Sequence, residues 1–143
     1  ALVELGATWA SESDGASAAV AVHGDALAAV GALGVGTVRL APLEPAQGLA
    51  VMAWTAASGG AHGRRRGMAA GRFSAWWAAA ALTGLLEDYP PEPDELGEAV
   101  AELRWWAWDA GGPEPGWACR LVVDDPSEGL GWALDATDRR SGP

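Results

Sequence analysis

The chain has 143 residues, a length typical of one domain built around a single core. Its formal net charge of −10 argues against an extended surface for duplex nucleic acid, which requires many cationic contacts to phosphates. The sequence contains no lysine, which excludes P-loop nucleoside triphosphatases, protein kinases and Schiff-base enzymes. One cysteine permits no internal disulfide, and nothing resembles a signal peptide, so we expect a cytoplasmic protein.

Membrane insertion and metal binding are also not expected from the sequence. The longest apolar stretch, residues 75–86, is shorter than the ~20 residues that span a bilayer. No C-x-x-C, H-E-x-x-H, G-x-S-x-G or EF-hand spacing occurs, so we expect neither a metal nor a cofactor. The acidic residues near the C-terminus are expected to be solvated; they are Asp124, Asp125, Asp135 and Asp138.

The N-terminal third predicts a β-α-β-like unit. Residues 16–23 read as a strand, and Asp25 is expected to cap a helix over residues 26–33. A second strand is expected over residues 37–41. Such a unit would be right-handed, with a crossover near the short limit.

Two Ala- and Trp-rich segments then predict a helical hairpin. The first helix is expected over residues 46–58 and the second over residues 67–86, with a glycine-rich stretch between them. The second segment carries Phe73, Trp76 and Trp77 on one side and further apolar residues on the other. A helix that is apolar nearly all round is typical of a central position, so we expect it to be the most buried element.

The remaining elements complete the predicted fold. A third helix over residues 94–110 has an apolar stripe opposite an acidic face, and residues 117–124 read as a strand in which Cys119 is a small buried group. Residues 126–137 fit either a helix start or the second strand of a hairpin, and we favour the hairpin. The fold class is therefore α/β or α+β: one domain over residues 1–143, with a small sheet packed on about three helices.

The uneven distribution of charge is the most informative feature for function. Residues 45–86 contain no Asp or Glu but hold Arg64, Arg65, Arg66 and Arg72, whereas the rest of the chain carries 5 − 19 = −14. These arginines surround the start of a predicted helix, where the helix dipole favours anions and disfavours cations. We therefore expect an anion nearby.

Two sources of that anion are open. The first is the protein's own carboxylates, for example Glu95, Glu98 and Glu102 on the third helix. The second is a small ligand, such as a phosphate, a nucleotide or a carboxylate, held by backbone N–H groups and guanidinium groups. His62 lies beside the arginines, and His23 ends a strand just before a helix start. Both are further candidate ligand-binding residues.

Trp105 and Trp108 lie off the main apolar stripe of the third predicted helix. Either another element covers them, or they form a contact surface for a second copy of the chain. In the second case we expect a homodimer through these two residues.

Three segments resemble uncharacterised conserved proteins of high-GC actinobacteria to which no activity is assigned. They are residues 59–85, residues 94–111 and the GWALDATD motif at residues 131–138. The resemblance implies no functional residue. Three function classes therefore stay open: a binding module for a small anion, which we favour, an assembly protein with a Trp-rich face, and an enzyme acting on an anionic substrate.

Overall fold

The computed structural model describes residues 1–10, 15–61, 65–112 and 116–139. Its fold is mixed α+β, as predicted. In chain order the elements are α1 (Glu4–Ala10), β1 (Ala16–His23), α2 (Ala26–Ala32), β2 (Arg39–Leu43), α3 (Pro45–Ala57), α4 (Met68–Leu82), α5 (Pro93–Glu102), β3 (Arg104–Asp109), β4 (Gly116–Asp125) and β5 (Leu130–Arg139).

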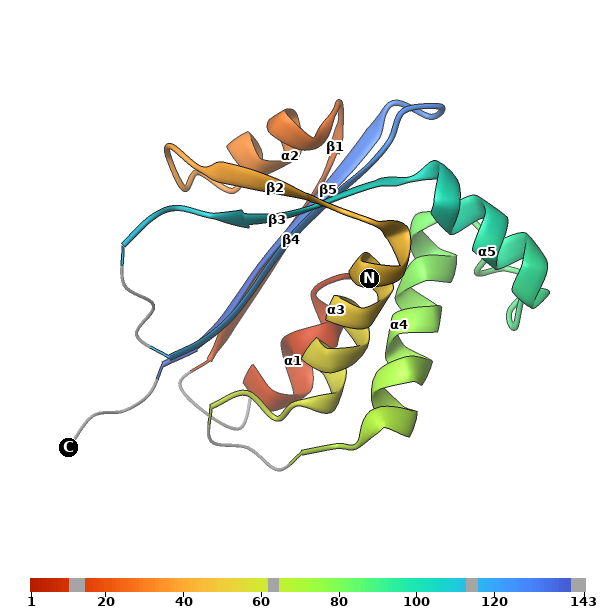
Figure 1. Cartoon of the computed structure of the whole chain (residues 1–143), viewed down its shortest axis with the longest axis horizontal. Coiled ribbons are helices and arrows are strands. Elements are labelled where there is room, and N and C mark those ends of the chain that lie inside the picture. The colour runs from red at the N-terminus through yellow and green to blue at the C-terminus, as the bar shows by residue number, and fades with distance from the viewer. Residues whose placement is uncertain (11–14, 62–64, 113–115, 140–143) are drawn as a thin grey trace.

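The five strands form one antiparallel sheet in the order β1-β5-β4-β3-β2. Helix α2 covers one face of this sheet, and α1, α3 and α4 lie on the other side (Figure 1). Each face has its own apolar core, the larger of which lies under α1, α3 and α4. The predicted β-α-β order is present, but β1 and β2 lie at opposite edges because β3, β4 and β5 occupy the centre.

Local capping explains where several helices begin and end. The Asp25 side chain accepts a hydrogen bond of 3.0 Å from the N–H of Ala28 and so caps α2, as predicted. Helix α3 begins with a capping box between Glu44 and Gln47. Helix α4 ends at Leu82, four residues earlier than predicted, and Gly84 follows with φ of +76°.

The predicted helix over residues 94–110 is wrong beyond Glu102, where the chain turns into β3. The apolar spacing continues past that point, but Leu103 is already extended and the next residues pair with β2 and β4. Trp105 and Trp108 therefore point to opposite faces of the sheet and enter different cores. Strand pairing outweighs the helical pattern here because aromatic residues suit a pleated sheet.

The expectation that α4 is the most buried helix is also wrong. Its small residues face the core, and Gly71 approaches α3 so closely that an added Cβ would collide with the Ala53 carbonyl and lie 2.7 Å from the Ala57 Cβ. The large residues Phe73 and Trp76 face outward and are 63% and 42% exposed. Side-chain size decides which face packs, since small residues permit close contact between helices.

The C-terminal hairpin is confirmed, with β4 and β5 joined by a short turn. The Asp125 carboxylate accepts hydrogen bonds from the N–H groups of Ser127 at 2.9 Å and Glu128 at 3.2 Å, and Gly129 adopts φ of +65°. These contacts are those of an Asx turn. Strand β2 is also present, shifted by two residues from its predicted position.

Candidate functional site

The predicted arginine cluster lies where α3 ends and α4 begins. His62 and Arg64 fall outside the described residues. The N–H of Arg66 donates a hydrogen bond of 2.8 Å to the Ala57 carbonyl, which ties the segment before α4 to the last turn of α3. Arg65 is exposed in this segment, and Arg72 is exposed on the second turn of α4.

Arg65 and Arg72 form no ion pair with any residue that the structure describes. The predicted carboxylate partners Glu95, Glu98 and Glu102 are exposed on α5, which meets the opposite end of α4 (Figure 1). Helix α4 begins after Gly67 without a side-chain cap. Neither of the two arginines is therefore neutralised by α5.

A shallow groove, which we call the α3–α4 groove, runs between these two helices beside Arg72. Its volume is about 360 Å³. It is lined by apolar side chains except for Arg72; the lining residues are Leu49, Ala50, Ala53, Met68, Arg72, Ala75 and Trp76. Met68 and Trp76 are 51% and 42% exposed, so the groove has large apolar walls open to solvent.

A second apolar hollow lies on the other side of α4, against α1. It measures about 560 Å³ and is lined by Glu4, Leu5, Phe73, Ser74 and Trp77. Phe73, which lines this second hollow, also contacts Tyr89, with ring centroids 6.2 Å apart. The outer side of α4 thus carries three large exposed apolar side chains, Met68, Phe73 and Trp76.

The structure separates His23 from the arginines. His23 is exposed at the end of β1, which lies beside α2 at the end of the molecule away from the start of α4 (Figure 1). The two candidate regions named from the sequence therefore do not form one site.

Trp105 and Trp108 are buried within the chain, at 2% and 4% exposure. The Trp105 indole packs on Gly48 of α3 and donates a hydrogen bond of 3.4 Å to the Val100 carbonyl. The Trp108 indole donates one of 3.1 Å to the Leu134 carbonyl. These side chains do not offer the contact surface that a dimer through them requires.

Two carboxylates of the acidic cluster are buried, contrary to the sequence-based expectation. Asp124 accepts hydrogen bonds from Arg104 at 2.7 and 2.9 Å and from the N–H of Ala26 at 3.0 Å. Asp138 accepts one of 2.7 Å from the N–H of Ala61. Both tie distant segments to the sheet, which is a structural role that spacing alone does not reveal.

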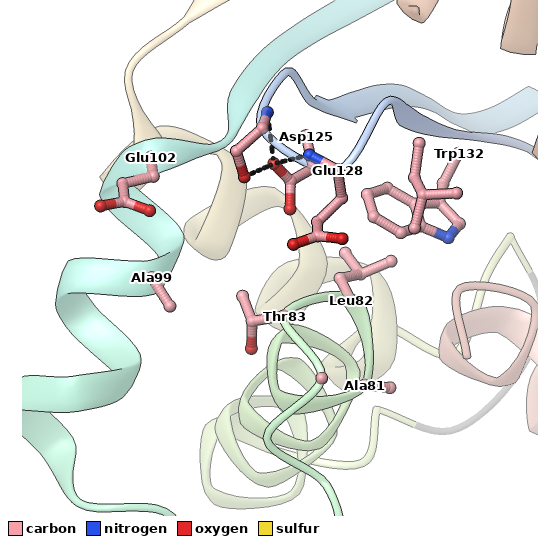
Figure 2. Close-up of a pocket in the computed structure, with 11 residues that line it drawn as sticks. Ala81, Leu82, Thr83, Ala99, Glu102, Asp125, Glu128 and Trp132 are labelled. Carbon is pink, nitrogen blue, oxygen red and sulfur yellow. Dashed lines mark hydrogen bonds between the residues drawn. The ribbon is translucent and has the colours of Figure 1, made fainter. Parts of the chain in front are cut away.

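A polar hollow of about 440 Å³ lies at the C-terminal end of α4, between α5 and the β4–β5 turn (Figure 2). Glu102, Asp125 and Glu128 contribute carboxylates to it, and Trp132 forms another wall. Asp125 is engaged in the turn. Within the described ranges, no group of three or more His, Cys, Asp or Glu side chains could hold a metal ion.

Cys119 is a buried free thiol in β4, as predicted. Burial raises its pKa, and a hydrogen bond with Thr55 opposes that increase. A thiol with a raised pKa is a poor nucleophile, so this residue suits a packing role.

The fold and these surfaces define a mixed α+β protein with an open apolar face and an adjoining cationic segment. The chain belongs to DUF6183, a family of unknown function, whose profile matches residues 1–139. No curated protein and no solved structure matches the chain. The expected kinship with proteins of unassigned activity is confirmed, whereas the actinobacterial origin stays a prediction. No helix in the described part is long and apolar enough to cross a membrane.

Proposed function

We propose that the protein is an interaction module that binds an acidic, apolar segment of a partner protein in the α3–α4 groove. One observation carries this proposal: Arg72 is an exposed cation, without an ion pair to a described residue, on the wall of an otherwise apolar groove. The surrounding residues 45–86 contain no Asp or Glu. An acidic segment would meet attraction there and repulsion over most of the remaining surface.

The shape of the groove favours side chains of a helix over a small polar ligand. Met68, Arg72 and Trp76 follow one another at spacings of four, so they form a row along α4 beside α3. Amphipathic helices dock in such grooves through apolar residues at spacings of three and four. A small polar ligand would require several converging polar groups, and only Arg72 supplies one in this groove.

Of the three anions expected from the sequence, a phosphate, a nucleotide and a carboxylate, we propose the carboxylate, carried by the acidic side chains of the partner segment. A phosphate or nucleotide bound by Arg64, Arg65, Arg66 and Arg72 around the start of α4 stays a prediction, and so does an enzymatic role. The test below separates these cases.

The experiment uses two synthetic helical peptides labelled with a fluorophore. One has leucines at positions i, i+3, i+4 and i+7 flanked by glutamates, and the other has glutamine at every glutamate position. Fluorescence anisotropy should show tighter binding of the acidic peptide. Arg72→Gln should weaken that binding about tenfold, which corresponds to ~1.4 kcal/mol, without changing binding of the glutamine peptide.

Matched controls exist elsewhere on the surface. Arg39→Gln removes another exposed arginine and should leave peptide binding unchanged. Trp76→Ala should weaken binding of both peptides, whereas Leu27→Ala, which removes an apolar side chain that is 65% exposed on α2, should not. Equal affinity for the two peptides would contradict the proposal. A melting temperature raised by inorganic phosphate, with no peptide binding, would favour the small-anion alternative.

A further inference from the structure

The two edges of the sheet differ in their capacity to pair with another strand. Strand β2 has five residues, includes Pro42 and carries Arg39 in an ion pair with Asp109. Proline and charge are the usual means of blocking an edge. Strand β1 has eight residues, ASAAVAVH, with no proline, glycine, acidic residue or arginine. Strand β1 therefore has neither the proline nor the charged side chain that would prevent pairing at its outer edge.

The register shows which backbone groups of β1 point outward. The N–H of Gly24 donates a hydrogen bond of 2.8 Å to the Gly129 carbonyl, in the same register as the β1–β5 pairs. Inward and outward groups alternate along an antiparallel strand. The outward N–H and C=O groups therefore belong to Ser17, Ala19, Ala21 and His23, the residues at odd positions.

Most of this edge is open to solvent, but Ser17 is half-buried and its hydroxyl donates a hydrogen bond of 3.3 Å to the Val3 carbonyl. Ala19, Ala21 and His23 are exposed, and β1 pairs with β5 alone among the described strands. No backbone hydrogen bond from another described residue reaches its outer side. An unpaired row of this kind is a template for strand addition.

We propose that β1 pairs antiparallel with β1 of a second copy, joining two sheets into one of ten strands. A two-fold axis at Val20 places Ser17 of one copy opposite His23 of the other, and Ala19 opposite Ala21. All four outward residues of each strand then find partners. Four pairs with two hydrogen bonds each give eight bonds between the copies.

Charge and side-chain size identify the second copy as the occupant. The occupant must be a strand without charge, with side chains small enough to lie beside Ala and Val on both faces, and β1 itself meets both conditions. Each copy carries a net charge of −10, which opposes contact between most pairs of surfaces. In a two-fold contact each surface meets the same surface of the other copy, so acidic and cationic surfaces both repel themselves, whereas the uncharged edge does not. This inference does not rest on the function of the α3–α4 groove.

Analytical ultracentrifugation of the whole chain tests the proposal. The wild-type protein should sediment with twice the mass of one chain, and added salt should strengthen the dimer because it screens the repulsion between copies. Ala19→Pro removes an outward N–H that β5 does not use, and it should yield a folded monomer. Ala19→Val is the matched control, since it adds bulk but retains the N–H, and it should stay dimeric.

Amide hydrogen exchange gives a second measurement that needs no variant. In the dimer the N–H groups of Ala19 and Ala21 should be protected, and their protection should fall as the protein is diluted. A wild-type monomer at high concentration would overturn the proposal. So would a dimer that survives Ala19→Pro, or rapid exchange at both positions in the concentrated protein.

Discussion

Arg104 and Asp124 lie directly opposite each other on β3 and β4, and their side chains form a two-point ion pair. Nε of Arg104 donates to Oδ1 of Asp124 at 2.7 Å, and Nη2 donates to Oδ2 at 2.9 Å. The same carboxylate accepts from the N–H of Ala26. One buried acid thus joins two strands to the first turn of α2.

Asp124→Asn should destabilise the protein by about 1–3 kcal/mol, because it weakens charge-assisted hydrogen bonds to Arg104 and to α2 at a buried position. Arg104→Gln should also destabilise it, since the carboxylate loses its cation. Urea unfolding measures both. Arg39→Gln is the control, since the Arg39–Asp109 pair is exposed and should contribute little. If all three changes lowered the free energy of unfolding equally, burial of Asp124 would make no difference to the stability that its ion pair contributes.

Gly71→Ala should destabilise the protein, because a Cβ at this position would collide with the Ala53 carbonyl and crowd the Ala57 Cβ. Gly97→Ala in α5 is the matched control: nothing lies within 4 Å of its added Cβ. That change should stabilise the helix by about 0.5–1 kcal/mol. Thermal melting of the two variants should shift in opposite directions, and a stabilising Gly71→Ala would contradict the close contact between α3 and α4.

Trp105→Ala should lower the free energy of unfolding by about 3–5 kcal/mol, because it leaves a cavity in the larger core beneath α3. Trp76→Ala should cost much less, since Trp76 is 42% exposed. Denaturant midpoints give the comparison. If Trp105→Ala left stability unchanged and altered only the association of chains, the indole would be a contact residue and the internal packing would be wrong.

Cys119 should react slowly with a thiol reagent until the protein unfolds, because it is 4% exposed and burial raises its pKa. The folded pKa lies above the unfolded value, so the stability that the neutral thiol contributes is present below the unfolded pKa. It is lost as pH rises through the folded pKa. Stability should therefore fall less steeply at alkaline pH in Cys119→Ala than in the wild type. Identical pH profiles would argue against this linkage.

Local signals predicted the elements that depend on local chemistry. The alternating small residues of β1, the Asp25 cap and the hairpin at Asp125 all act within a few positions, and each is found in the structure. The end of α5 was missed because strand pairing decides it: Trp105 pairs with Val123, which lies 18 positions away. The helical spacing of apolar residues gives no information about strand pairing between residues so far apart in the sequence.

The candidate site was only partly predictable for a similar reason. The absence of acids around Arg72 can be read directly from the sequence, but the groove beside it depends on which face of α4 packs. Hydrophobicity predicted that Trp76 would be inside. The close fit of Gly71 against Ala53 places the small face inside instead, and Trp76 becomes a wall of the groove.

The position of β1 beside β5 has a consequence for synthesis on the ribosome. Ala16 pairs with Thr137, so β1 cannot join its neighbour until β5 has been translated. Until then the uncharged β1 has both of its edges open. Closure of the sheet on the nascent chain therefore follows the synthesis of β5, and conditions that slow translation between β1 and β5 should favour aggregation through β1.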